Sequence, residues 1–159
     1  MEQHDKLDNN DILRKLRYTF DFDEPKIISL FALADYIVTK AQVVKWLHKE
    51  NHTQYERLED KELAVFLNGL IIEKRGLKDG VIPVPEFELD NNIIFRKLRI
   101  ALQLKDDDIL EYLMHAGLKI SPHELSAFFR KPGQKQYRKC KNQILRRFLQ
   151  GLQFKHKGD

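Results

Sequence analysis

The sequence has little of the features that define several simple classes of protein. Its 159 residues include a single cysteine, which excludes a disulfide-stapled scaffold and fits a reducing compartment. No stretch approaches the ~18 uncharged apolar residues that a membrane span needs. The N-terminus is polar and acidic, unlike a signal peptide. We therefore expect a cytoplasmic protein that makes no membrane contact.

Signatures of catalysis and of cofactor binding are also scarce. The sequence has no glycine loop to cradle phosphates, no Gly-x-Ser-x-Gly and no His-Glu-x-x-His. His48 and His52 have the spacing of metal ligands on one helix, but no set of cysteines or carboxylates completes a tetrahedral site. Cys140 lies between two lysines, which favours a thiolate, yet its place in an apolar stripe favours a small buried side chain. We predict no metal, no cofactor and no catalytic residue.

What the sequence does have is an internal duplication. Apolar residues make up 42% of the chain, too many for a disordered protein. When the chain is shifted by 82 positions without a gap, 20 of the 70 residues in 7–76 match their counterparts in 89–158. We name residues 7–76 the first copy and residues 89–158 the second copy. The stretch between them, 77–88, contains prolines and predicts an extended linker.

Each copy predicts four short helices and no sheet, because its apolar residues recur three and four positions apart. Asp8 is a good N-cap, and Ser121 begins a capping box with Glu124. The second helix, from Glu24 to Tyr36, is apolar nearly all round and is expected to be central. The expected fold is all-α: two tandem pseudo-symmetric units of about four short helices each, joined by a proline-containing linker.

The duplicated motifs resemble those of a known family. Asn-Asn-x-x-x-Arg-Lys-Leu-Arg begins both copies, at Asn9 and at Asn91. The second copy adds Arg130-Lys131-Pro132-Gly133-x-x-x-Tyr137-x-x-Cys140 and a run from Asn142 to Leu152. The chain resembles the YehS-like family of uncharacterised bacterial proteins, which are built from a tandem domain of unknown function. The resemblance implies a cytoplasmic bacterial protein and supplies no catalytic residues.

Charge separates the two copies. Residues 1–76 hold 12 Lys/Arg against 14 Asp/Glu, and the linker holds 1 against 3. Residues 89–159 hold 15 against 7, so the overall net charge of +4 is an average of unlike parts. Three basic residues of the first helix recur in both copies, even in the acidic one, so we expect them to pair with acids of the neighbouring helix and to cover the core with their alkyl stems. They are Arg14, Lys15 and Arg17, with the counterparts Arg96, Lys97 and Arg99.

The longest basic stretch predicts a binding surface for a polyanion. Ten Lys/Arg and no acid lie between Leu125 and Gly158. We expect the last helix to include Lys135, Arg138, Lys139, Asn142 and Arg146, which step by three or four and would form a polar face. A face of one charge releases counterions when it binds nucleic acid, although a plain solvated face is the simpler interpretation. The candidate site residues are Arg130, Lys131, Lys135, Arg138, Lys139, Lys141, Arg146 and Arg147.

A second, weaker hint comes from the middle helices of each copy. Thr39 to Trp46 and Ser121 to Phe128 have the spacing of the second half of a helix-turn-helix motif. In that interpretation, Ser126, Arg130 and Lys131 would lie along the exposed side of a reading helix. The turn lacks the usual glycine, and any capped helix in a small bundle has the same spacing, so we favour the simpler explanation.

Three functions follow from these observations, in decreasing order of support. The first is a non-catalytic protein that contacts RNA or DNA through the basic second copy. The second is an adaptor that docks an acidic protein, with Trp46 and the Phe128-Phe129 pair as anchors if they are exposed. The third is a small-molecule enzyme with a site between the copies.

Overall fold

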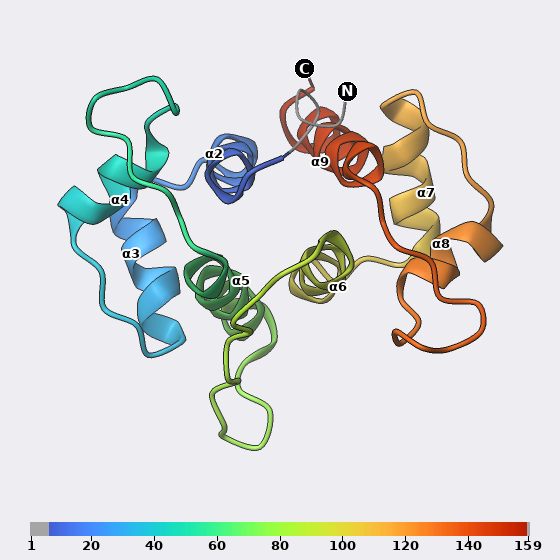
Figure 1. Ribbon diagram of the computed structural model, residues 1–159, viewed down its shortest axis with the longest axis horizontal. Helices are drawn as coiled ribbons and strands as arrows, with labels where there is room; N and C mark the ends of the chain where they lie inside the picture. Colours follow the sequence, from blue (N-terminus) through green and yellow to red (C-terminus); the bar gives the residue numbers. More distant parts are fainter. Residues whose placement is uncertain (1–6, 159) are drawn as a thin grey trace. The chain divides into compact units, whose positions relative to one another are not determined.

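The regular structure of the protein is helical (Figure 1). The computed structural model describes residues 7–158, and within that range an isolated bridge between Lys78 and Val81 is the one β-type pairing. The first copy contains α2 (Asn9–Phe20), α3 (Glu24–Leu33), α4 (Lys40–Leu47) and α5 (Asp60–Arg75). The second copy contains α6 (Asn91–Ala101), α7 (Asp106–His115), α8 (Pro122–Phe128) and α9 (Asn142–Lys157). The predicted all-α fold is confirmed.

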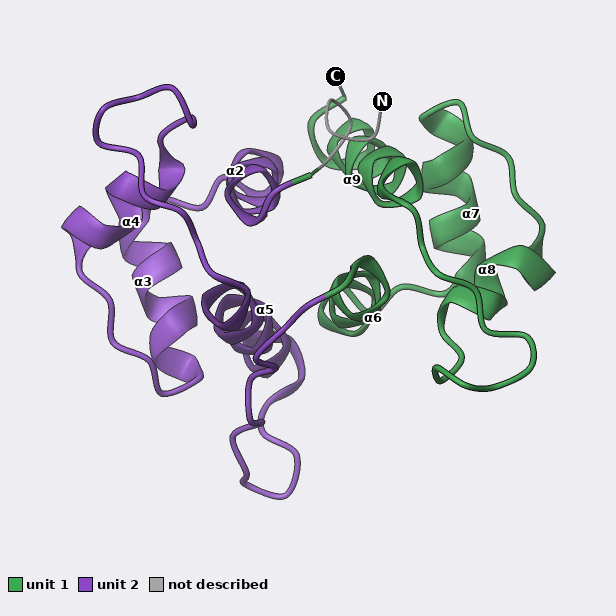
Figure 2. Cartoon of the chain, in the orientation of Figure 1, with its two compact units in different colours: residues 1–7, 90–159 green, residues 8–89 purple. Residues whose placement is uncertain are grey.

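The chain divides into two compact units (Figure 2). One spans residues 8–89, and the other spans residues 90–158 together with Leu7. The linker therefore groups with the helices of the first copy. Its end is fixed to the start of α5, because the backbone N–H of Leu89 donates to Oδ2 of Asp60 at 2.9 Å.

The helices begin where short polar side chains accept hydrogen bonds from free backbone N–H groups. Asp8 accepts from the N–H of Asp11 at 2.7 Å to begin α2, and Asp90 has the same role for α6. Ser121 begins α8 with the predicted capping box. Its Oγ accepts from the N–H of Glu124 at 3.0 Å, and its own N–H donates to Oε1 of Glu124 at 2.9 Å.

The helices pack in the same pattern in both copies, and one glycine in each copy makes the closest contact possible. In the first copy α3 packs against α4 and α5, and in the second α7 packs against α8 and α9. A Cβ atom at Gly69 would lie 1.8 Å from the carbonyl oxygen of Leu30, and one at Gly151 would lie 2.1 Å from that of Tyr112. Only glycine permits this approach, which explains why both positions are identical in the duplication.

A buried asparagine joins three segments of the first copy. Nδ2 of Asn10 donates to the carbonyl oxygens of Trp46 and Glu56, both at 2.9 Å. Its Oδ1 accepts from the N–H of Leu58 at 3.0 Å. One side chain thus supplies hydrogen-bond partners for three backbone groups that have no partner within a helix.

Asn92 makes the same three bonds in the second copy. It donates to the carbonyl oxygens of Phe128 at 3.0 Å and Arg138 at 2.8 Å, and it accepts from the N–H of Cys140 at 2.8 Å. The Asn-Asn motif that begins each copy is therefore a structural element, and its identity in both copies reflects folding.

An aromatic cluster fills the core of the first copy. The ring of Phe31 on α3 lies 5.4 Å from that of Trp46 and 5.6 Å from that of Phe66, measured between centroids. Trp46 is fully buried. This cluster joins α3, α4 and α5.

The second copy fills the same space from a different helix. Phe95 on α6 packs on Phe148 at 4.7 Å and on Phe128 at 6.4 Å, the counterparts of the two partners of Phe31. Its own counterpart in the first copy is Leu13, whereas Phe31 corresponds to Leu113. The large and small residues have exchanged helices, so each copy keeps about the same core volume.

Helix α3 differs from the expectation in length and in burial. It ends at Leu33 and does not reach Tyr36. It buries Ile27, Leu30 and Phe31 on one face, while Leu33 is 39% exposed. The helix therefore covers the core from one side, because only that face meets α4 and α5.

Candidate nucleic-acid interface

The eight predicted site residues lie in two separate places. Residues 130–141 connect α8 to α9; we name them the basic loop. This loop holds six cations and no acid: Arg130, Lys131, Lys135, Arg138, Lys139 and Lys141. The other two site residues, Arg146 and Arg147, lie on α9.

The predicted basic helical face that begins at Lys135 is wrong, because α9 begins only at Asn142. The reason is Asn92, whose bonds to the carbonyl oxygen of Arg138 and the N–H of Cys140 hold these backbone groups away from helical pairing. The first members of the expected face therefore lie on the basic loop: Lys135, Arg138 and Lys139.

A tight turn shapes the first half of the basic loop. The N–H of Gln134 donates to the carbonyl oxygen of Lys131 at 3.1 Å, across Pro132 and Gly133. Gly133 has a φ of 92°, as the third residue of a type II turn requires. The Gln134 side chain also accepts from the N–H of Lys131 at 2.9 Å, so both ends of the turn are fixed.

The corresponding loop of the first copy, residues 48–59, shares this backbone pattern and has a different charge. The N–H of His52 donates to the carbonyl oxygen of Lys49 at 2.9 Å, as Gln134 does to Lys131. The N–H of Glu56 donates to the carbonyl oxygen of Lys45 at 3.2 Å, and Arg138 repeats this bond with Ala127 at 3.1 Å. Residues 48–59 contain two Lys/Arg and three Asp/Glu. Loops with the same backbone hydrogen bonds thus carry a net charge of −1 in the first copy and +6 in the second.

The cations of the basic loop are available to a ligand. Five of them are exposed, and Arg130 is half-buried. Within residues 7–158, none of the six forms a salt bridge. Within the described chain, none of the six is therefore held in a close ion pair by a carboxylate.

The two arginines of α9 have a different setting. Nη1 of Arg147 donates to the carbonyl oxygen of Ala116 at 2.9 Å, at the end of α7, so this residue helps to terminate that helix. Nη2 of Arg146 is buried and has no hydrogen-bond partner among the described residues. Both line a hollow of about 350 Å³ with Gln143 and Gln150.

A second hollow, of about 230 Å³, lies where the basic loop meets α8. Its lining brings together an aromatic ring, two basic side chains, a histidine and two groups that can bond the edge of a planar ligand. The lining residues are His123, Glu124, Ala127, Lys135, Gln136, Tyr137 and Arg138. The sequence alone did not identify His123, Gln136 or Tyr137 as site residues, although the identity of Gln54-Tyr55 with Gln136-Tyr137 was a visible signal.

Two groups of this hollow have shifted pKa values. Hydrogen bonds with Ser121 lower the pKa of the Glu124 carboxyl, and the nearby charge of Arg138 acts in the same direction. Partial burial raises the pKa of the Tyr137 hydroxyl. Glu124 is therefore a hydrogen-bond acceptor at neutral pH, and Tyr137 remains a neutral ring.

Cys140 is buried, as its place among apolar residues predicts. Burial raises the pKa of its thiol to about 12, despite the lysines on either side in the sequence. At neutral pH the side chain is an uncharged thiol, so it fills space below the basic loop.

The helix-turn-helix interpretation does not fit the second copy. Helix α8 has 7 residues and ends at Phe128, so Arg130 and Lys131 lie beyond it. Ser126 is half-buried, and α8 itself contains no Lys or Arg. The simpler explanation, a capped helix in a small bundle, fits better.

Of the basic residues repeated in both copies, Arg17 and Arg99 pair as expected, whereas Arg14 pairs with Asp11 of its own helix. Arg17 lies 3.9 Å from the carboxylate of Glu24, and Arg99 lies 2.9 Å from that of Asp106. Arg99 also lies over the ring of Phe129, 4.6 Å from its centroid. Arg17 and Arg99 thus join the first and second helices of each copy.

The two histidines with ligand-like spacing do not share a helix. His48 follows the end of α4, and its ring stacks on that of His52 at 3.7 Å between centroids. Nδ1 of His52 accepts from the N–H of Gln54 at 2.9 Å. Across residues 7–158, no three His, Cys, Asp or Glu side chains gather in a way that could hold a metal ion.

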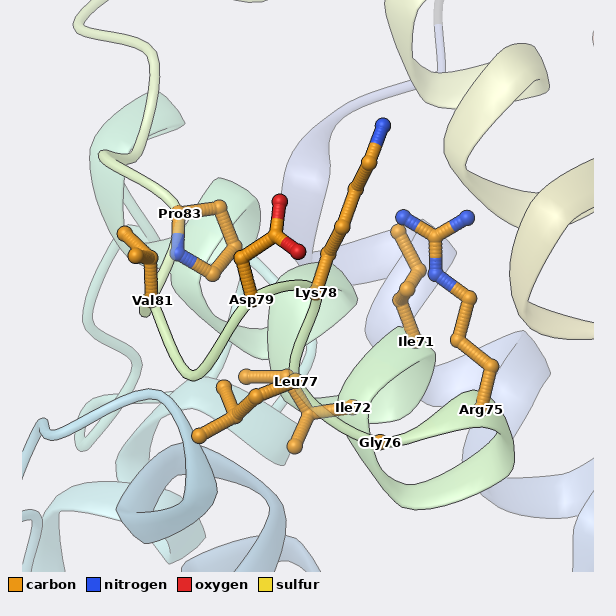
Figure 3. Close-up of a pocket in the computed structure, with 9 residues that line it drawn as sticks. All are labelled: Ile71, Ile72, Arg75, Gly76, Leu77, Lys78, Asp79, Val81 and Pro83. Carbon is orange, nitrogen blue, oxygen red and sulfur yellow. The ribbon is translucent and has the colours of Figure 1, made fainter.

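An apolar hollow of about 310 Å³ lies at the end of α5, beside the start of the linker (Figure 3). Ile72 and Leu77 line it, and Asp79, Lys78 and Arg75 are the charged groups at its margin. The anchors expected for a protein adaptor lie elsewhere and are covered: Trp46 is 0% exposed and Phe128 is 7% exposed. The third expected anchor, Phe129, is half-buried. The adaptor hypothesis therefore loses Trp46 and Phe128 as anchors and keeps the basic face on which it rests.

Helices long and apolar enough to cross a bilayer are absent from residues 7–158.

Comparison with known proteins places both copies in one family. Residues 9–76 and residues 91–158 each match a family described as "Protein of unknown function (DUF1456)". The chain is 43% identical over 146 residues to the uncharacterized protein YehS of Escherichia coli strain K12, across 91% of this chain and 93% of that protein. No solved structure matches the chain. The resemblance to the YehS-like family is thus confirmed.

Proposed function

The chain belongs to the DUF1456 family of proteins of unknown function, with two copies of the domain, and from this premise we propose that the second copy binds nucleic acid through the basic loop. The proposed binding is non-catalytic. Its main support is one comparison: the same loop carries six cations without an acid in the second copy and a net charge of −1 in the first.

The chemistry of this surface suits phosphates better than a folded protein partner. Lys and Arg side chains release condensed counterions when they neutralise phosphates, so affinity depends steeply on salt. If about six cations reach phosphates of a duplex, the slope of log affinity against log salt is about −5. Phosphate contacts fix the position of the protein on the nucleic acid but do not distinguish one base sequence from another. We therefore expect tight binding with little preference for sequence.

The duplication offers a matched test. Lys131 and Lys139 correspond to Lys49 and Arg57 of the first copy, and all four are exposed. The double variants Lys131→Glu/Lys139→Glu and Lys49→Glu/Arg57→Glu therefore change the net charge by the same amount at equivalent places. Fluorescence anisotropy with a labelled DNA of about 20 nucleotides, single-stranded and duplex, measures affinity between about 50 and 200 mM salt.

We expect the variant of the basic loop to weaken binding at least about tenfold and to reduce the salt slope by about 2. The matched variant of the first copy should leave both nearly unchanged. Equal losses in the two variants would show a nonspecific effect of net charge and would contradict the proposal. An absence of binding by the unaltered protein at low salt would contradict it as well.

A further inference from the structure

The hollow between α8 and the basic loop has a chemistry of its own, separate from the exposed cations. At about 230 Å³ it is smaller than the roughly 300–1,000 Å³ of pockets that enclose whole small molecules. It suits a single planar ring. Tyr137 and Arg138 supply an aromatic ring and a planar guanidinium, the two side-chain types on which unstacked bases lie in proteins that bind single strands.

The polar groups of the hollow can meet the edge of such a ring. The Gln136 amide both donates and accepts, and the Glu124 carboxylate accepts. One oxygen of Glu124 already accepts from the N–H of Ser121 at 2.9 Å, which fixes this side chain at the margin of the hollow. Lys135 adds a positive charge beside the ring site, where a phosphate of the same strand would follow.

The equivalent place in the first copy is built differently. There, Gln42 donates to Glu56, so the two side chains meet directly. Their counterparts, Glu124 and Arg138, form no salt bridge with each other within the described chain. The first copy also has Lys45 where the second has Ala127, whose small side chain leaves the hollow open.

The rest of the surface favours a single strand over a duplex. The major groove of a duplex admits a helix or a β-ribbon, which can contact base edges there. Helix α8 carries no Lys or Arg, and its exposed first turn contains Glu124. The cations lie on a loop around the hollow, where a flexible strand can follow them.

Building on the proposed function, we propose that this hollow accepts one unstacked base of a single-stranded nucleic acid, with Tyr137 and Arg138 as its stacking surfaces. The second copy then contacts both phosphates and a base, and it prefers single strands to duplexes.

Three labelled probes of equal length test this proposal with the full chain: an oligothymidine, an abasic strand of the same backbone, and a duplex. Base stacking predicts that oligothymidine binds about tenfold tighter than the abasic strand. The duplex should bind more weakly than oligothymidine at the same salt. The variant Lys131→Glu/Lys139→Glu should weaken all three, because it acts on phosphates.

Two variants change the lining of the hollow. Tyr137→Leu should reduce the preference for oligothymidine and leave affinity for the abasic strand unchanged. Tyr55→Leu of the first copy, which also loses a hydroxyl bond to Oδ1 of Asn10 at 3.2 Å, should cost stability and leave the preference unchanged. Ala127→Lys introduces the residue that the first copy has at this position. It should strengthen binding of the abasic strand through its charge and weaken binding of oligothymidine by filling the hollow.

The outcomes separate this proposal from the proposed function. Equal affinity for oligothymidine and the abasic strand, with both still lost in Lys131→Glu/Lys139→Glu, would overturn the base site and leave phosphate binding in place. A duplex that binds tighter than the single strand would also overturn it. If no probe binds, the proposed function itself fails. If Tyr137→Leu does not fold, as circular dichroism would show, the opposite responses of Ala127→Lys decide the question.

Discussion

The loops at residues 48–59 and 130–141 share their backbone hydrogen bonds and differ in their charge. Asn10 and Asn92 fix both loops through the same three bonds. On this common support the first copy has Glu56 where the second has Arg138. The comparison teaches that the two asparagines, which are identical in both copies, build the fold. The positive charge of the basic loop lies mostly at positions that differ between the copies, such as Arg138.

Loss of the buried asparagine should have the largest effect on this comparison. Asn92→Ala leaves three backbone groups without partners, and at roughly 1–3 kcal/mol for each group we expect a loss of about 4 kcal/mol in the free energy of unfolding. Asn10→Ala should cost a similar amount, measured by urea unfolding. Only Asn92→Ala should also weaken nucleic-acid binding, because it releases the basic loop. Equal binding losses in both variants would contradict this division of roles.

Substitution of the packing glycines should have the next largest effect. A methyl group at Gly69 or Gly151 meets a backbone carbonyl oxygen of the facing helix, so the helices must separate, at a cost of about 3 kcal/mol. Gly117→Ala is the control, because its Cβ meets nothing within 4 Å and only its positive φ is unfavourable, which costs about 1 kcal/mol. Thermal or urea unfolding distinguishes the two cases. If Gly151→Ala lowered the free energy of unfolding no more than Gly117→Ala does, the close approach of α7 and α9 would be contradicted.

Loss of the N-caps of α4 and α8 should have the smallest effect on stability. The stability contributed by the two caps should also differ in its dependence on pH. Ser121→Ala and Thr39→Ala should each cost about 1 kcal/mol at neutral pH. Glu124 completes the capping box of α8, whereas Gln42 stands at that position in α4 and does not titrate. Since folding lowers the pKa of Glu124 from 4.5, its contribution is present above that value and is lost as the pH falls below it. The cost of Glu124→Gln should therefore shrink in acid, and that of Thr39→Ala should not, as urea unfolding at two pH values will show.

The sequence predicted those parts of the fold that local chemistry determines. Asp8 and Ser121 cap helices as expected, because N-caps act within one turn. The duplication predicted two similar units, and the burial of Cys140 followed from its apolar neighbours. Of the repeated basic residues, Arg17 and Arg99 pair with acids of the next helix as predicted, whereas Arg14 pairs within its own helix.

The start of α9 and the shape of the candidate site were beyond local reasoning. Tyr137 and Cys140 are three positions apart, a spacing that a helix and an anchored loop both satisfy. What decides between them is Asn92, whose bonds to residues 138 and 140 span 46 and 48 positions of sequence. The hollow escaped prediction for the same reason, because it forms only where α8 and the basic loop meet.

The first copy has Leu13 on α2 and Phe31 on α3, whereas the second has Phe95 and Leu113 at these positions. This difference has a consequence for recombination between the halves of the gene. A hybrid second copy that received α3 in place of α7 would have two phenylalanines directed at Phe148, and its core would be overfilled. The reciprocal hybrid would have two leucines there and a void. Each copy is thus a matched set of helices whose core residues are not interchangeable with those of the other copy.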